Sequence, residues 1–383
     1  MNVTGYELFE VPPRWLFLRL DTDEGISGWG EPIAEGHAKT VATEVESIID
    51  NYLLGKDPKE IERHWQAMYR GRHYRGGPIL MSAVGGIDQA LWDIKGKYYD
   101  TPAYELLGGR SRDRIRLYQW VGGDTPEATA EAAATAVENG YRTLKLAAVT
   151  RMRRIGSPES IGESSDRLAA IRDRLDEDVD IALDFRGRVT KSMAKWLGRE
   201  LDQYDPIFYE EPVLPEHLDM LPRIETHTKT PIATGHRLYS RWEFKQRLDQ
   251  TVVDVVQPDP SHCGGITEAK KIATAAEAND SSATFHCSVG PIAFAACIQL
   301  ATAVPNTILQ GQNLDIHAPE DNGLLEYLRD PGVFRFEDGS VQPPDAPGLG
   351  IDVAEELVRE RSKTDVDWQH PTWYHEDGSV AEW

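Results

Sequence analysis

The sequence predicts an α/β fold, in which a (β/α)8-type TIM barrel follows a smaller α+β domain. Three observations support this prediction. From residue 116 onward, short β-branched or apolar runs alternate with helical segments, which is the pattern of a barrel. Several of these runs end in an acidic or histidine residue at a regular spacing. The preceding residues lack this rhythm and combine a hairpin with long helical patterns.

The N-terminal domain begins with a predicted hairpin. Residues 14–21 and 26–31 form its strands, and the turn between them is Asp23-Glu24-Gly25. Three helices follow, and the last of them carries apolar side chains at helical spacing. These helices are predicted over residues 39–53, 59–69 and 81–97.

The barrel domain is predicted from eight strand-like runs that are each followed by a helical segment. The runs cover residues 117–121, 143–146, 181–185, 207–210, 231–234, 252–257, 283–286 and 307–310. The competing fold, a doubly wound open sheet, needs a glycine-rich phosphate-binding turn after an early strand, and the sequence has none. Beyond residue 341 we expect a helix over residues 353–361 and an aromatic tail that returns to cover the N-terminal domain.

The composition indicates a globular protein with two domains. A chain of 383 residues, of which 40% are hydrophobic, can bury a sizeable core. The sequence shows no secretory signal and no apolar run long enough to cross a bilayer, so a soluble, cytoplasmic protein is expected. The three cysteines have no CxxC spacing and are expected to be buried free thiols: Cys263, Cys287 and Cys297.

The net charge of −22 comes from 63 acidic and 41 basic side chains. This charge argues against nucleic acid or an anionic membrane as a partner, because both bind positive surfaces. Only 13 of the 41 basic residues are lysine. An acidic, lysine-poor surface is the pattern expected in concentrated salt, so we hold a halophilic source as a hypothesis. Full stability after dialysis to low salt would contradict it.

Five residues that can carry chemistry lie at or just beyond the ends of predicted strands. They are spaced 23 to 27 residues apart, and a further step of 25 reaches Gly311. In a barrel this spacing places them around one mouth, where barrel enzymes hold their catalytic residues. Such residues are common in loops, but five at this spacing indicate a functional site. They are Asp184, Glu210, His236, Asp259 and His286.

These residues lie in motifs that resemble the mandelate racemase-like group of the enolase superfamily. The motifs are ALWDIKGK at residues 90–97, Asp184-Phe185, Glu210-Glu211-Pro212 and Gln257-Pro258-Asp259. Within the group, the chain is most similar to the D-galactonate dehydratases over nearly its full length. The strings that carry this similarity are PPRW at 12–15, YRGGPILMSA at 74–83, WVGGD at 120–124, GGITE at 264–268, HED at 375–377 and SVAEW at 379–383.

The resemblance implies a capping domain of residues 1–110, joined by the C-terminal tail 341–383, over a (β/α)7β barrel of residues 111–340. It also implies a homo-oligomeric hydro-lyase that acts on a small sugar acid. The reaction is Mg²⁺-assisted removal of the proton α to the carboxylate, then loss of the β-hydroxyl to give a 2-keto-3-deoxy acid. Because that proton is very weakly acidic, a cation must stabilise the enediolate while a base takes the proton.

The resemblance also implies the metal ligands. Asp184 and Glu210 match two carboxylate ligands of the family, and His236 stands where the family has a Glu. Imidazole is a poor ligand for Mg²⁺ and a good one for Mn²⁺, Fe²⁺ or Zn²⁺. Mg²⁺ is therefore the cofactor implied by the resemblance, with Mn²⁺ or no metal as the alternatives.

His286 and Asp259 match the family's catalytic base dyad, in which the Asp orients the imidazole and supports its charge. The alternative is a pair kept for its hydrogen bond alone. Arg186 stands where the family has a second acid–base His. Arginine cannot shuttle a proton, so Arg186 is predicted to bind a substrate carboxylate or to pair with Asp184. Gly311 replaces a Glu that stabilises the enediolate, which leaves a gap for water or substrate.

Lys145 is the other predicted substrate-binding residue. It matches the first Lys of the group's Lys-x-Lys motif, while Ala147 takes the second place, and Lys145 is expected to meet a barrel carboxylate. Relative to the family, His236 removes one negative charge and Arg186 adds one positive charge, a change of +2 that equals the charge of Mg²⁺. The hypothesis follows that the Arg186 guanidinium lies where the metal would be. Two other functions stay open: a non-catalytic, metal-free sugar-acid-binding or regulatory relative, and a Mn²⁺-dependent epimerase with Lys145 as its single base.

Overall fold

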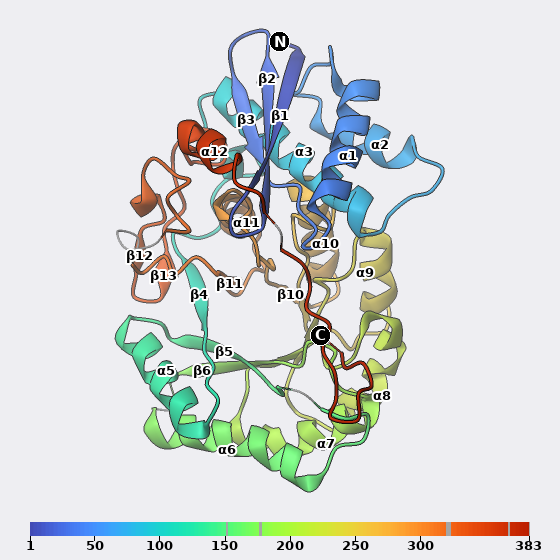
Figure 1. The fold of residues 1–383 in the computed structure, drawn as a ribbon, viewed down its shortest axis with the longest axis vertical. Coiled ribbons are helices and arrows are strands. Elements are labelled where there is room, and N and C mark those ends of the chain that lie inside the picture. Colours follow the sequence, from blue (N-terminus) through green and yellow to red (C-terminus); the bar gives the residue numbers. More distant parts are fainter. Residues whose placement is uncertain (151, 176–177, 319–322, 367, 383) are drawn as a thin grey trace.

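The structure is a computed structural model that describes residues 1–383 except 151, 176–177, 319–322, 367 and 383. Two sheets organise it, one of three antiparallel strands and one of ten strands that is mostly parallel. Figure 1 shows the small sheet at one end of the molecule and helices α5, α6 and α7 around the other end. The predicted barrel with an N-terminal α+β domain is confirmed, whereas the exact domain boundaries stay a prediction.

The N-terminal sheet has the strand order β1-β2-β3, and all three strands are antiparallel. Strands β2 and β3 are the predicted hairpin, whereas β1 was not predicted. The bounds are β1 Val3–Val11, β2 Trp15–Thr22 and β3 Ser27–Gly30. The helices that follow are α1 Ala38–Ile48, which continues as one π-helical turn at Ile49–Leu53, then α2 Ile61–Arg70, α3 Pro78–Tyr98 and α4 Ala103–Leu106.

Helix α3 packs directly on β3, and glycines make this close approach possible. A Cβ at Gly30 would lie 1.9 Å from the backbone oxygen of Gly86 in α3. The same helix reaches the barrel, because Asp88 in α3 accepts hydrogen bonds from the backbone N–H and the hydroxyl of Thr267 at 3.0 and 2.6 Å. Helix α3 therefore connects the N-terminal sheet to the barrel.

The barrel strands pair in parallel in the order β10-β9-β8-β7-β6-β5-β4, and β11 pairs with β4. A parallel bridge from Ala283 to Thr307 joins β10 to the segment before β11, so the pairing returns to β4. The bounds are β4 Ile115–Trp120, β5 Thr143–Ala147, β6 Asp180–Asp184, β7 Phe208–Glu210, β8 Ile232–Thr234, β9 Val255–Val256, β10 Ser282–Ala283 and β11 Gln310–Gly311. The hairpin of β12 Phe336–Glu337 and β13 Ser340–Val341 adds to β4 in antiparallel fashion.

Helices connect the strands, and several begin at a residue whose side chain caps a free backbone N–H. Thr125, Ser157 and Thr190 cap α5, α6 and α7 in this way. The helices are α5 Pro126–Glu138, α6 Pro158–Arg174, α7 Lys191–Leu201, α8 Leu221–Glu225, α9 Arg241–Leu248, α10 Gly265–Glu277, α11 Pro291–Ala303 and α12 Glu355–Arg361. Short 3-10 turns lie at Asp202–Tyr204, Pro215–Met220 and Pro331–Val333.

The C-terminal tail covers two regions rather than one. As predicted, α12 packs on the N-terminal sheet, where Arg359 pairs with Glu7. The last residues lie instead against the barrel, since the Arg188 guanidinium stacks over the Trp373 ring at 4.5 Å and Arg153 pairs with Glu376 at 3.0 Å. The prediction that the aromatic tail covers the N-terminal domain was therefore wrong for these residues.

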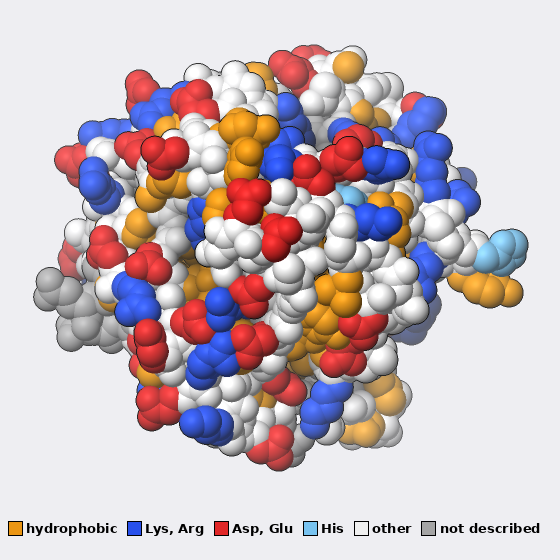
Figure 2. Space-filling model, turned by 90° about the horizontal axis from the view of Figure 1, so that it is seen from above, with side chains coloured by type: hydrophobic (Ala, Val, Ile, Leu, Met, Phe, Trp, Pro, Cys, Tyr) orange, Lys and Arg blue, Asp and Glu red, His pale blue; other side chains and the backbone are white. Residues whose placement is uncertain are grey.

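The surface and core agree with the composition. The face in Figure 2 carries acidic and basic side chains interspersed, so the acidic excess does not gather in one patch there. All three cysteines are buried and free, as predicted. In the part of the chain that the structure describes, no helix is long and apolar enough to cross a membrane.

Candidate active site

The candidate site lies at the C-terminal ends of the barrel strands, where the parallel pairing brings the predicted residues together. Asp184 and Glu210 are the last residues of β6 and β7, and these two residues pair in register. His236, Asp259 and His286 follow β8, β9 and β10. All five are in contact with at least one other residue of the set or with Lys145.

Lys145 projects from β5 between the two carboxylates. Its amine donates to Glu210 Oε2 and lies 3.7 Å from Asp184 Oδ2. Burial lowers the pKa of Lys145, but Glu210, Tyr118 and Asp184 together outweigh burial and raise the pKa above its usual value. Gln257 also donates to Glu210 Oε2, at 2.7 Å. The expectation that Lys145 meets a barrel carboxylate agrees with this contact.

Arg186 lies on the outer side of Asp184. Its backbone has a φ of 52°, and its N–H donates to Asp184 Oδ1 at 2.7 Å. The guanidinium stacks over the Trp120 ring at 4.9 Å, and its Nε is 3.8 Å from Asp184 Oδ2. The amine of Lys145, rather than the Arg186 guanidinium, lies between the two carboxylates, and the placement of Arg186 in the position of the metal stays a hypothesis.

His236 brings a buried nitrogen to the other oxygen of Glu210. Its Nδ1 is 3.6 Å from Glu210 Oε1 and 3.7 Å from Glu211 Oε1. Among the described residues, neither Nδ1 of His236 nor Oε1 of Glu210 has a hydrogen-bond partner. Burial, and next the charge of His286, lower the pKa of His236 well below its usual value, so the imidazole is neutral.

As placed, these residues do not fit a Mg²⁺ ion. Mg²⁺ prefers near-octahedral oxygen donors, whereas here Lys145 lies between Asp184 and Glu210 and the third donor is the imidazole of His236. Within the described ranges, no group of three or more His, Cys, Asp or Glu side chains is arranged to hold a metal ion. The two unpartnered atoms, one oxygen and one nitrogen, form a donor pair that suits Mn²⁺ or Zn²⁺ better than Mg²⁺.

His286 and Asp259 form the predicted pair. His286 Nδ1 and Asp259 Oδ2 are 2.7 Å apart, and Ser261 N–H donates to Asp259 Oδ1 at 2.7 Å. Burial alone would lower the pKa of His286, but the hydrogen bond to Asp259 and the charges of Asp259 and Glu210 together raise the pKa above its usual value. The His286 ring stacks on His236 with centroids 4.5 Å apart. With Nδ1 bound, Nε2 is the nitrogen left to take a proton.

Tyr118 fills the space beside Gly311. A Cβ at Gly311 would lie 2.1 Å from Tyr118 Oη and 2.4 Å from its Cζ. Tyr118 is buried in the barrel, and its hydroxyl is 3.5 Å from Lys145 Nζ. The prediction of a gap for water or substrate at Gly311 is therefore wrong, because the phenol ring of Tyr118 already occupies this space.

Sequence reasoning missed Tyr118, Trp120 and His262. His262 Nε2 is 3.7 Å from Asp259 Oδ2, and its Nδ1 is 3.1 Å from the hydroxyl of Ser82 in α3. The strand-end rule could have found Trp120, because it ends β4, one strand–helix unit before Lys145. From the sequence alone, an aromatic residue at that position is expected to belong to the hydrophobic core.

Comparison with known proteins identifies relatives in the family that the sequence motifs resemble. Residues 13–108 match the family "Mandelate racemase / muconate lactonizing enzyme, N-terminal domain", and residues 127–357 match "Enolase C-terminal domain-like". The chain is 48% identical over 383 residues, all of both chains, to a D-galactonate dehydratase of Ralstonia pickettii (strain 12J), and 46% identical over the same length to one of Cronobacter sakazakii.

Two solved structures extend the comparison. A putative galactarate dehydratase from Agrobacterium radiobacter, with Na and L-malate bound, superposes with a TM-score of 0.91 at 29% identity over all of both chains. A putative mandelate racemase/muconate lactonizing enzyme from Labrenzia alexandrii DFL-11 gives a TM-score of 0.90 at 32% identity, covering 97% of this chain and 99% of that one.

Proposed function

The chain belongs to the mandelate racemase/muconate lactonizing enzyme family of the enolase superfamily, and from that premise we propose that it dehydrates a sugar acid of the D-galactonate type to a 2-keto-3-deoxy acid. It is an enzyme of the hydro-lyase class. The substrate's identity and stereochemistry, the catalytic roles of the residues and the cation are the parts that we propose.

The observation that carries this proposal is the hydrogen bond between His286 and Asp259 at the barrel mouth. Nε2 of His286 takes the proton α to the substrate carboxylate, and the Asp259 charge stabilises the imidazolium that forms. The β-hydroxyl then leaves as water after it accepts a proton from a solvent molecule, because Arg186 cannot donate one. His262 and His286 hold the pKa of Asp259 below its usual value although burial opposes this, so Asp259 stays ionised as His286 gains its proton.

Fixed positive charges of the chain support the negative charge that develops on the substrate. Lys145 is buried and held by Glu210, and Arg186 is the partly exposed cation at the mouth, with its guanidinium over Trp120. A preorganised cation stabilises an enediolate without reorganisation during the reaction. Arg186 binds the substrate carboxylate in this proposal, and it remains protonated throughout.

The cofactor is part of the proposal. Mg²⁺ is what the family resemblance implies, and Mn²⁺ or no metal are the alternatives because His236 replaces a carboxylate ligand. A divalent cation would supply Lewis-acid stabilisation of the substrate carboxylate. The predicted cytoplasmic location, homo-oligomer and halophilic source stay predictions.

The test is direct. The purified protein, in molar KCl, is incubated with D-galactonate and its diastereomers, with Mg²⁺, with Mn²⁺ and with a chelator, and loss of one water is followed by mass spectrometry. We expect one acid to give a 2-keto-3-deoxy product, and the His286→Gln variant to give none. If no acid loses water under any condition, the non-catalytic alternative replaces this proposal. Equal rates for the native and variant proteins would remove His286 from the mechanism.

A further inference from the structure

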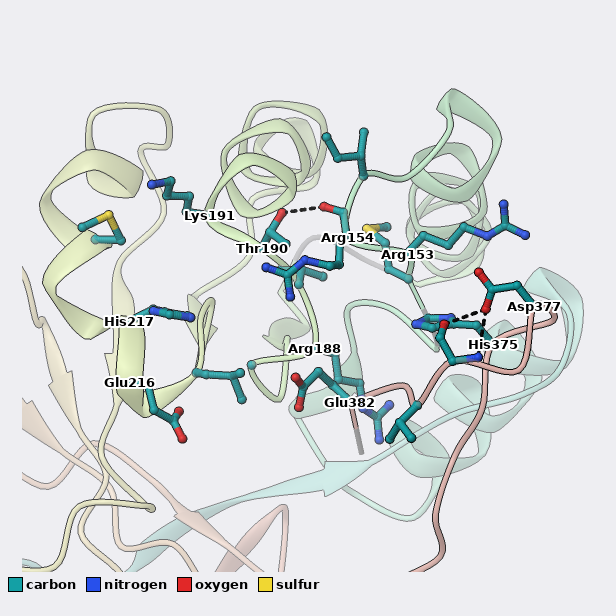
Figure 3. Close-up of a pocket in the computed structure, with 18 of the residues that line it drawn as sticks. Arg153, Arg154, Arg188, Thr190, Lys191, Glu216, His217, His375, Asp377 and Glu382 are labelled. Carbon is teal, nitrogen blue, oxygen red and sulfur yellow. Dashed lines mark hydrogen bonds between the residues drawn. The ribbon is translucent and has the colours of Figure 1, made fainter.

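A separate cavity of about 730 Å³ lies beside the candidate active site. Figure 3 shows side chains from the loops after β5, β6 and β7 and from the C-terminal tail converging on it. None of Asp184, Glu210, His236, Asp259 or His286 lines it. The loop after β6 serves both regions, because Arg186 contacts Asp184 whereas Arg188, two residues later, lines this cavity.

Arg188 is the unusual residue of the cavity, since its guanidinium is buried and incompletely bonded. The residue is 7% exposed, and its Nη1 donates to the backbone oxygen of Thr150 at 3.1 Å. Its Nε and Nη2 are buried and have no hydrogen-bond partner in the described part of the chain. Burial, and next the charge of Arg186, lower the pKa of Arg188 to about 10. It therefore remains a cation at neutral pH.

The two unpartnered nitrogens share one edge of the guanidinium plane. This edge is the one that binds both oxygens of a carboxylate or phosphate in a bidentate pair. A buried charge without a partner is costly, and so is a buried N–H that is left without a hydrogen bond. Among the described residues, no carboxylate accepts a hydrogen bond from Nε or Nη2 of Arg188.

The surroundings favour an anion at the base of the cavity. Arg154 and Lys191 line it, and helix α7 begins there with its capping residue Thr190. The positive end of the helix dipole adds to these charges. Four acidic residues also line the cavity, and all of them are exposed: Glu216, Asp219, Asp377 and Glu382.

We propose that this cavity is a binding site for a small molecule that carries a carboxylate or phosphate group, with that group held by Nε and Nη2 of Arg188. The C-terminal tail forms one wall of the site, since Trp373 stacks on the same guanidinium and Glu376 pairs with Arg153. The site goes beyond the proposed dehydration, and binding to it is measured without turnover.

The test is calorimetric titration of the full chain with inorganic phosphate, acetate and succinate, in the lowest salt that preserves the fold. Arg188→Met removes the charge, and Arg188→Lys keeps the charge but loses the bidentate edge. Arg199→Gln is the matched control, because Arg199 is exposed on α7 and does not line the cavity. We expect at least one anion to bind the native chain, both Arg188 variants to bind it about tenfold more weakly or not at all, and the control to bind it within about twofold of native.

Three outcomes would overturn the proposal: no binding by the native chain, equal binding by the Arg188 variants, or an equal loss in Arg199→Gln. Should both Arg188 variants fail to fold, a crystal structure of the native protein at saturating phosphate decides, since density must then lie beside Nε and Nη2. A further titration with sugar acids identifies which ligand supplies the carboxylate or phosphate group bound at Arg188. Competition between phosphate and a sugar diacid, but not a monoacid, would assign the site to a second carboxylate of the substrate, and no competition would assign it to a separate anion.

Discussion

The contact between Gly311 and Tyr118 makes a quantitative prediction about the barrel interior. The φ of Gly311 is not positive, so an alanine there has no backbone strain and would ordinarily stabilise the chain by about 0.4–1 kcal/mol. Tyr118 reverses the sign, because the new Cβ would lie 2.1 Å from its Oη and 2.4 Å from its Cζ. Overpacking of this kind costs about 1–3 kcal/mol, so Gly311→Ala is expected to be destabilising by that amount.

The assay is urea unfolding of Gly311→Ala, Tyr118→Leu and the double variant at one fixed KCl concentration. Tyr118→Leu removes the ring atoms that clash but leaves a cavity, and it is destabilising on its own by about 2–4 kcal/mol. In the double variant the added methyl group no longer clashes, so the two effects should not add, with a favourable coupling of about 1 kcal/mol or more. Additive effects within about 0.5 kcal/mol, or a Gly311→Ala variant as stable as the native chain, would refute the reasoning.

Three further predictions concern buried charges. Asp259→Asn should lower kcat about 10²–10⁴-fold, because the amide no longer stabilises protonated His286, while the free energy of unfolding stays unchanged. The measurement is kcat and KM on the identified substrate. Lys145→Met should lower the free energy of unfolding, measured by urea denaturation, by about 3–5 kcal/mol, because Glu210 is left buried without its cation. Adding Glu210→Gln should recover part of this loss. Burial raises the pKa of Glu31 to about 8, so the native state holds the extra proton, and stability should fall as pH rises between about 5 and 8; Glu31→Gln should flatten this slope in thermal unfolding curves.

The order of elements could be read from the sequence because strand and helix patterns alternate so regularly in the barrel. Strand lengths could not, since β9 pairs only at Val255 and Val256 although residues 252–257 were predicted. The residues that flank β9 form no strand pairs, and those that follow it place their side chains at the mouth of the barrel. Strand β1 was not predicted, and its pairing with β2 shifts register between Val3 and Gly5.

The site was predictable where it depends on the spacing of strand ends, as for Asp184 and His286. It was not predictable where two distant elements share one space, as Tyr118 of β4 and Gly311 of β11 do. The same limit applies to Arg188. Its bonding depends on which groups the fold brings to a buried guanidinium, and spacing along the chain carries no information about that.

Charge balance connects these observations to cation binding. The carboxylates of Asp184 and Glu210 are offset by Lys145 and Arg186, whereas the sequence argument had counted Arg186 alone. A divalent cation would leave a buried excess of two positive charges and would have to displace Lys145 from Glu210, which is costly.

The native chain should therefore bind Mg²⁺ weakly. The Arg186→His/His236→Glu double variant removes one positive charge and adds one carboxylate, so the same group of side chains then carries two negative charges. We expect calorimetric titration in molar KCl to show saturable Mg²⁺ binding by the double variant and at least tenfold weaker binding by the native chain. Equally tight binding by the native chain would show that Lys145 moves away at little cost, and the charge argument would then be wrong.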